Sequence, residues 1–358
     1  MATLVFVSIC TLINVFKALP ADERRQPHTE IVKEYYTQRS HAPGTLLISE
    51  GIVIAPKAGG LPHFPGIWSQ EMITAWERPG LLIANTYSPY QVTDSIHAKG
   101  SFIFCQLFGQ GRSADPKVLA AEDSSFPYVS ASAIPLSTRP SDVPRPLSVD
   151  EIHEYTQLFV QASLNAIEAG FDGVEIHGAN GYLLDQFTQD VSNHRTDEYG
   201  GSIENRARFP LEVVDAVVKV CILESSLTRN NGLDMTMTDP VPTFTYFANE
   251  IKRRHPHFAY LHAVEPRVAG TAFRDEDEIK PQEENDFLRK IWAPKPFISA
   301  GHTRASGIEA ADEKGDLVAF GRQFISNVSC CLHVCFLLSI RMIGEPSIFH
   351  VNIPMHRL

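Results

Sequence analysis

Short apolar runs of strand length alternate with longer segments whose apolar residues recur every three or four positions. The short runs are nearly continuous in apolar residues, which is typical of strands buried on both faces of a parallel sheet. This pattern predicts strands over residues 45–50, 100–107, 172–177, 258–266, 296–302 and 316–322.

The segments between these runs are predicted to be helices, and the clearest of them begins after Ser148. Ser148 and Glu151 have the spacing of a capping box, and apolar residues follow at helical intervals as far as Ile167. Gly170 is the expected end of this helix. Further helices are predicted over residues 203–219, 242–254, 283–291 and 304–313.

The alternation of strand and helix determines the expected fold class. Buried strands separated by helices form a parallel sheet, which is either closed into a barrel or open and doubly wound. The chain has 358 residues and no second zone of distinct composition. At this length a single α/β domain, a (β/α)8 TIM barrel, is favoured over two domains or a doubly wound sheet. We therefore expect residues 1–358 to form one domain.

Polar residues stand at the carboxyl ends of the predicted strands, where barrels carry their chemistry. These strand-end residues are Glu50, Gln106, His177, Glu265, His302 and Arg322. Gly109 and Gly111 resemble part of a dinucleotide fingerprint, but the third glycine and the downstream acid are missing, so a Rossmann fold is not expected.

Glycines close the last two predicted strands, Gly301 in one and Gly321 in the other, and Arg322 follows the second. Loops after the last strands of a barrel commonly hold phosphate, since a backbone without Cβ can approach the anion closely. Arg322 adds a bidentate cation. A pair of turn glycines beside a surface arginine is the alternative interpretation.

His177, Asn180 and Tyr182 stand close together after the strand 172–177. Two neutral donors that converge on one point suit an oxygen that gains negative charge, and a phenol can deliver a proton. Singly, each residue also has an ordinary structural interpretation: a turn asparagine, a core histidine and a packing aromatic residue.

Composition and charge exclude some classes of binding partner. The formal net charge of −11 argues against nucleic acid or an anionic membrane as a partner, and no apolar run is long enough to span a bilayer. The six cysteines form no Cys-x-x-Cys pair, so we expect free thiols, no metal and a cytoplasmic location. The apolar run within residues 1–16 is interpreted as a strand, with a secretion signal as the alternative.

The stretch GFDGVEIHGANGYLLDQFTQDVSNHRTDEYGGSIENRARF, residues 170–209, is very similar to the corresponding segment of the Old Yellow Enzyme family, the FMN-dependent ene-reductases, including their fungal branch. The resemblance continues through residues 34–51, 97–112, 259–267 and 316–327. It implies a TIM barrel that binds FMN, takes electrons from NADPH and reduces the C=C bond of a small enone or enal.

The resemblance also implies roles for individual residues. His177 and Asn180 take the place of the pair that hydrogen-bonds the substrate carbonyl, and Tyr182 that of the tyrosine that protonates the α-carbon. Phe108 falls on the aromatic position that shapes the substrate pocket.

The family's cofactor residues match further positions. Gln106 corresponds to the glutamine that binds the flavin ring, and Gly51 to the glycine that packs beside it. Gly301, Gly321 and Arg322 correspond to the residues that hold the FMN phosphate.

Four stretches depart from the family pattern: residues 1–30, 78–91, 220–234 and 328–358. The threonine that ends the family's first strand and the arginine that ends its fifth are not found, so the first and fifth strands of the barrel are not recognisable. A catalytically impaired or non-catalytic remnant that binds flavin weakly is therefore the alternative function. An aldolase-like barrel ranks below both, because it needs a Schiff-base lysine or metal carboxylates at strand ends. The sequence makes no prediction of oligomeric state.

Overall fold

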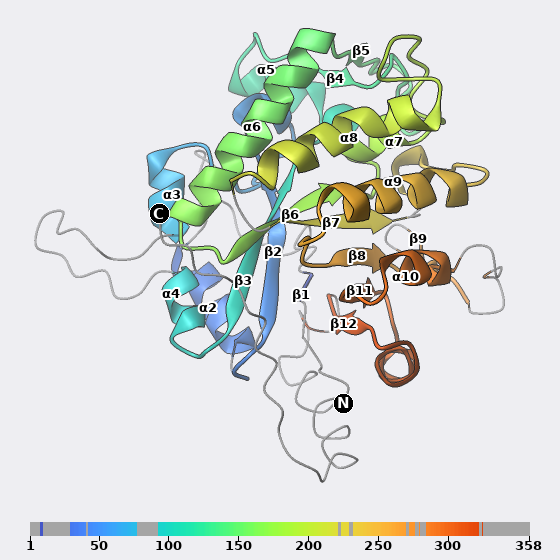
Figure 1. The fold of residues 1–358 in the computed structure, drawn as a ribbon. Helices are drawn as coiled ribbons and strands as arrows, with labels where there is room; N and C mark the ends of the chain where they lie inside the picture. Colours follow the sequence, from blue (N-terminus) through green and yellow to red (C-terminus); the bar gives the residue numbers. More distant parts are fainter. Residues whose placement is uncertain are drawn as a thin grey trace, which may run out of the picture.

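The main sheet has eight strands, seen in a computed structural model of the chain (Figure 1). The structure describes residues 8–9, 29–40, 42–76, 92–220, 223–228, 232–269, 272–275, 279, 284–321 and 324. The strands are β1 (Ser8–Ile9), β2 (Leu46–Val53), β3 (Phe102–Phe108), β6 (Gly173–Gly178), β7 (Leu223–Thr228), β8 (Leu261–Val264), β11 (Phe297–Ala300) and β12 (Leu317–Ala319).

Every neighbouring pair in this sheet is parallel, and the strands follow one another in chain order. This is the strand order of a (β/α)8 barrel and differs from that of a doubly wound sheet, in which the order reverses. Within the described residues, β1 and β12 are the two outer strands of the ladder.

The main helices lie between successive strands and pack side by side, with α6 against α8, α8 against α9 and α9 against α10 (Figure 1). The described helices are α2 (Thr29–Arg39), α3 (Gln70–Trp76), α4 (Val92–His97), α5 (Pro116–Glu122), α6 (Val149–Glu168), α7 (Leu183–Thr188), α8 (Ile203–Val217), α9 (Val241–Arg254), α10 (Asp286–Trp292) and α11 (Arg304–Glu309). Two short ladders lie outside the main sheet: β4 (Val129–Ser130) with β5 (Arg145–Pro146), and β9 (Val268–Ala269) with β10 (Ala272–Phe273).

Helix α6 begins as predicted. The Ser148 hydroxyl accepts from the backbone N–H of Glu151, and the Glu151 carboxylate accepts from that of Ser148, which completes a capping box. Gly170 has a φ of +83°, the left-handed conformation that glycine adopts without steric cost just after a helix.

The expectation that the first and fifth strands could not be recognised is corrected by β1 and β7. The two residues of β1 lie within the apolar run at the start of the chain, as the strand interpretation required, and they pair with Leu47 and Ile48. Strand β7 lies in the stretch 220–234, where the fifth strand was not recognisable from the sequence, and pairs with β6 and β8. Its backbone is satisfied by the two neighbouring strands, so a weak local pattern does not prevent strand formation.

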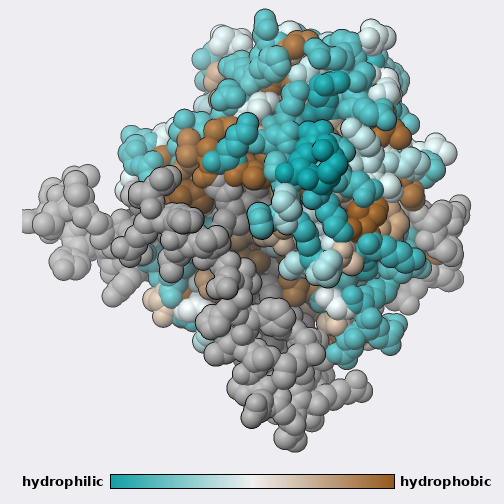
Figure 2. Space-filling model, viewed as in Figure 1, coloured by the Kyte–Doolittle hydropathy of each residue, from teal (hydrophilic) through white to brown (hydrophobic). Residues whose placement is uncertain are grey.

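Among the described residues, the large exposed apolar side chains come from several elements, as with Ile31 of α2, Phe102 of β3, and Leu164 and Ile167 of α6. Figure 2 shows a face on which hydrophilic residues predominate and apolar residues gather in smaller patches. None of the helices in the described part of the chain is both long and apolar enough to cross a membrane.

Candidate active site

Four of the predicted site residues meet at the carboxyl ends of β2, β3 and β6. Gly51 is in register with Gln106, and Leu107 is in register with Ile176, so Phe108 and His177 leave their strands side by side. The phenyl ring of Phe108 lies so close to Gly51 that a Cβ added there would be 2.9 Å from Cε1 of Phe108. Gln106 and His177, two of the predicted strand-end residues, thus lie near the carboxyl ends of β3 and β6.

A tight turn after β6 carries Asn180 and Tyr182. Asn180 and Gly181 have φ values of +59° and +78°, so the chain reverses through two left-handed residues before Tyr182 caps α7. The turn is held from α7, because the Gly181 N–H donates to the Asp185 carboxylate over 2.9 Å and Gln186 Nε2 donates to the Gly181 carbonyl over 2.7 Å. Asp185 and Gln186 thus fix the conformation of this turn.

Aromatic rings and polar groups converge at this turn. The ring centroid of Tyr182 lies 4.9 Å from that of Phe108 and 5.4 Å from that of His177. Asn180 Nδ2 lies 3.4 Å from His177 Nε2. The side chains of His177, Asn180 and Tyr182 therefore lie close together just after β6.

Burial determines the protonation of this group. Desolvation lowers the pKa of His177 to about 4, against a weaker opposing effect of Glu175, so the imidazole is neutral at pH 7. Desolvation also raises the pKa of Tyr182 to about 12, so its phenol keeps its proton. His177 Nδ1 is buried and has no partner among the described residues.

A buried polar cluster beneath this layer was not found from the sequence. Glu175 accepts hydrogen bonds from Gln106 Nε2 at 2.6 Å, from His262 Nδ1 at 3.0 Å and from the Tyr260 hydroxyl at 3.3 Å. The available signal was a glutamate in the middle of an apolar strand, because a fully buried carboxylate requires donors.

The strand-end glycines lie on neighbouring strands. Ala300 is in register with Ala319, so Gly301 and Gly321 follow neighbouring strands, one and two residues beyond this pair. Gly301 has a φ of +92°, and a Cβ there would be 2.5 Å from Cγ2 of Val268, so only glycine fits. The open backbone suits a phosphate group. Arg322, the predicted cation, lies outside the described residues.

Two other predicted strand-end residues belong to a separate ionic cluster. Glu265 pairs with Arg289, whose Nη2 also lies 2.6 Å from Asp316. The ligand atoms of Glu265, His302 and Asp316 lie within 4.8 Å of one another, a spacing that metal ligands can have. Arg289, however, already supplies positive charge to both carboxylates.

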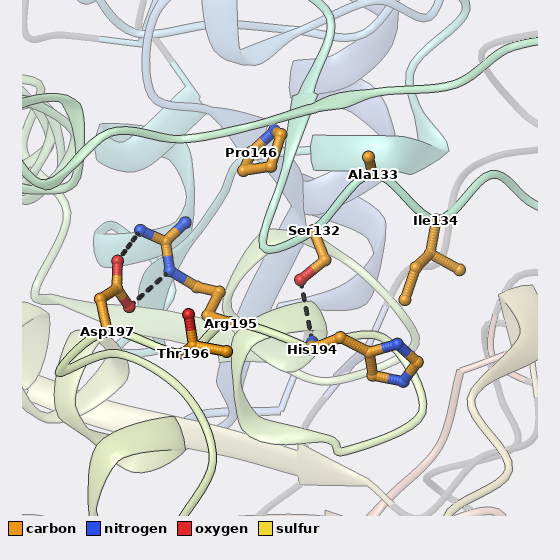
Figure 3. A pocket seen from close by; sticks show the side chains of 8 residues that line it. All are labelled: Ser132, Ala133, Ile134, Pro146, His194, Arg195, Thr196 and Asp197. Atoms are coloured by element: carbon orange, nitrogen blue, oxygen red, sulfur yellow. Dashed lines mark hydrogen bonds and ion pairs between the residues drawn. The ribbon is translucent and has the colours of Figure 1, made fainter.

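A surface cavity of about 450 Å³ lies apart from these residues (Figure 3). The backbone N–H of His194 donates to Ser132 Oγ over 2.9 Å, and Arg195 pairs with Asp197. None of the candidate site residues lines the cavity, which is lined by Ser132, Ala133, Ile134, Pro146, His194, Arg195, Thr196 and Asp197.

Comparisons with known proteins found similar chains. Residues 18–334 match the model of the NADH:flavin oxidoreductase / NADH oxidase family. The chain is 43% identical over 308 residues to chanoclavine-I aldehyde reductase fgaOx3 of Penicillium roqueforti, covering 83% of this chain and 77% of that protein. It is 43% identical over 316 residues to the probable inactive reductase easA of Epichloe festucae var. lolii, covering 83% and 76%.

A solved structure has the same fold. The Old Yellow Enzyme homologue from Zymomonas mobilis superposes with a TM-score of 0.77 at 28% identity, over 96% of this chain and 90% of that one.

Proposed function

The chain belongs to the NADH:flavin oxidoreductase / NADH oxidase family, and from this premise we propose how its site residues act. It is an FMN-dependent oxidoreductase of the Old Yellow Enzyme type, with NAD(P)H as electron donor. The reaction is reduction of the C=C bond of an α,β-unsaturated carbonyl compound, and the proposal assigns this chemistry to one barrel domain.

The residues at the strand ends fit FMN. A Cβ at Gly301 would lie 2.5 Å from Val268, so the backbone stays bare there, and together with Gly321 and Arg322 it would hold the phosphate. Gly51 and Gln106 would hold the ring system. The chemistry supplied by bound FMN is two-electron transfer, as hydride, from NAD(P)H to the substrate β-carbon.

His177 and Asn180 bind the carbonyl oxygen of the substrate. Their nitrogen atoms lie 3.4 Å apart, close enough for one oxygen to accept from both. The depressed pKa of His177 keeps the imidazole neutral, so it donates a hydrogen bond to the substrate without transferring a proton to it. Both donors act where negative charge develops as hydride reaches the β-carbon.

Tyr182 delivers the proton to the α-carbon. Its ring is fixed by Phe108 and His177, and its pKa of about 12 keeps the proton in place until a strong base forms beside it. Phe108 forms one wall of the substrate pocket. The observation that carries the proposal is this convergence of Asn180, His177 and Tyr182 at one strand end.

Product analysis tests the proposal. The FMN-loaded chain is incubated in D2O with NADPH and 2-cyclohexenone, and the product is examined by mass spectrometry and NMR. Cyclohexanone with one solvent deuterium on the α-carbon is expected. An allylic alcohol with an intact C=C bond would contradict the proposal, because carbonyl reduction would then be the activity.

A catalytically impaired remnant with an incomplete barrel is the second candidate function. The similarity to a relative named probable inactive favours it. Purified protein that stays colourless after addition of FMN would support this candidate over the enzyme.

A further inference from the structure

The side-chain amide of Gln106 has a defined orientation. Its Nε2 donates to Glu175 Oε1 over 2.6 Å. A carboxylate accepts hydrogen bonds, so the amide oxygen of Gln106 is excluded from this contact and the usual ambiguity between O and N of an amide is resolved. The carbonyl oxygen and one N–H of Gln106 are left for another partner.

Glu175 is itself held from the far side of β7. Its second oxygen, Oε2, accepts from His262 Nδ1 at 3.0 Å and from the Tyr260 hydroxyl at 3.3 Å, and both donors belong to the β8 side of the sheet. All four side chains are buried, with exposed fractions of 6% for Gln106 and 0% for Glu175. Three donors to one carboxylate leave Glu175 little freedom to rotate.

Hydrogen bonding indicates the charge of this cluster. His262 Nε2 is buried without a partner in the described part of the chain, so a doubly protonated imidazole would leave an unsatisfied N–H on a cation. A neutral His262 that donates through Nδ1 leaves only a lone pair. Three donors around Glu175 favour its ionised form, so the cluster carries one negative charge.

The cluster forms the layer beneath the substrate residues. Gln106 is in register with Gly51 on one side and with Glu175 on the other. Phe108 and His177 follow two residues later on the same strands, so their side chains lie one layer nearer the mouth of the site. The free groups of the Gln106 amide therefore belong to the layer assigned to the cofactor ring.

We propose that Glu175 is a positioning residue for the flavin, which it serves by fixing the Gln106 amide. In this orientation Gln106 offers an acceptor and a donor to the N–H and C=O groups of the isoalloxazine pyrimidine ring. The negative charge of Glu175 also lowers the reduction potential of the bound flavin. The proposal rests on the assignment of Gln106 to FMN made above.

A matched pair of amide substitutions tests it. Glu175→Gln removes the charge and lets Gln106 turn over, whereas Glu250→Gln removes the charge of a glutamate on α9 that pairs with Arg253 and Arg254. Both variants and the parent are titrated with FMN by fluorescence quenching, and the midpoint potential of the bound flavin is measured against a reference dye. For Glu175→Gln we expect roughly tenfold weaker FMN binding, the effect of losing one well-placed hydrogen bond, and a higher potential. Glu250→Gln should stay within about twofold of the parent.

A double variant separates positioning from a purely structural role. Gln106→Glu combined with Glu175→Gln restores a donor–acceptor pair and thereby thermal stability, but it presents a carboxylate to the flavin. Positioning predicts that FMN binding does not recover with stability. Recovery of both would overturn the proposal, as would an unchanged affinity and potential in Glu175→Gln.

Tyr260→Phe provides a milder perturbation if the glutamate variants fail to fold. It removes one of the three donors without changing the shape of the core, and about two- to threefold weaker FMN binding is expected as Glu175 loosens. An unchanged affinity would overturn the proposal. None of these measurements uses an enone. If the variants bind FMN more weakly but the parent reduces no enone, only the proposed reaction is refuted. If the parent reduces enones but the variants bind FMN as the parent does, only the role of Glu175 is refuted.

Discussion

Replacing Tyr182 by phenylalanine tests the proton-donor role with little change to the fold. The tyrosine ring packs against Phe108 and His177 at centroid distances of 4.9 and 5.4 Å, and phenylalanine keeps both contacts. No hydrogen bond joins the Tyr182 hydroxyl to another described residue. We therefore expect the free energy of unfolding to change by less than about 1 kcal/mol.

The expected kinetic effect is large and confined to one half of the reaction. A positioned general acid contributes roughly 10²- to 10⁴-fold, or about 3–5 kcal/mol of barrier. The pKa of Tyr182 is raised to about 12, so the phenol is protonated throughout pH 6–9 and the parent's rate should not depend on its ionisation there. Flavin reduction by NADPH needs no proton from Tyr182 and should stay within about twofold of the parent.

Anaerobic stopped-flow absorbance at the flavin band separates the two half-reactions. The reductive phase is followed after mixing with NADPH, and the oxidative phase after mixing reduced protein with 2-cyclohexenone. Slowing of the oxidative phase alone is the expected result. An unchanged oxidative phase in Tyr182→Phe would show that the proton comes from elsewhere, and equal slowing of both phases would indicate a general defect.

Three further substitutions test the account. Asn180→Ala removes a donor to the substrate carbonyl and also places alanine at a φ of +59°, whereas Asn180→Gly removes only the donor. A similar loss of enone turnover in both variants, roughly tenfold, would confirm the donor role. A loss of turnover in Asn180→Ala alone would refute it. Burial raises the pKa of Glu50 from 4.5 to about 7, so the folded chain binds this proton more tightly than the unfolded chain does, and stability falls as pH rises from 4.5 to 7. In thermal melts Glu50→Gln should be more stable than the parent by up to about 3 kcal/mol above pH 7 and equally stable at pH 4. A gain in stability that does not depend on pH would contradict this. Gly301→Ala should weaken FMN binding by at least about tenfold, because its Cβ would lie 2.5 Å from Val268. Gly315→Ala has the same kind of backbone strain in open space and should leave the affinity for FMN unchanged. Equal FMN affinities of the two variants would refute the role of the close approach at Gly301.

The sequence predicted those strands whose own residues are apolar almost throughout. Residues 100–107 and 172–177 are apolar almost throughout because helices cover one side and the barrel interior the other, and they became β3 and β6. The strand-end rule then located His177 and Gln106, since parallel strands bring their carboxyl ends to one edge.

Strand β7 was missed because its sequence, LESSLT, has little strand propensity of its own. Its pairing with β6 and β8 is a tertiary effect that local patterns do not encode. The bond between Glu175 and His262 was missed for a related reason: the two residues are 87 positions apart, and only the closeness of β6 and β8 across β7 joins them. The pair between Glu265, a predicted strand-end residue, and Arg289 joins positions 24 apart in the sequence and was likewise not predicted.

The most direct test of the central claim is one anaerobic spectral experiment on the purified, FMN-loaded chain. NADPH should bleach the flavin bands, and a subsequent addition of 2-cyclohexenone should restore them, with one equivalent of saturated ketone per flavin. A chain that retains no flavin after desalting, or a reduced flavin that the enone leaves bleached, would contradict the account.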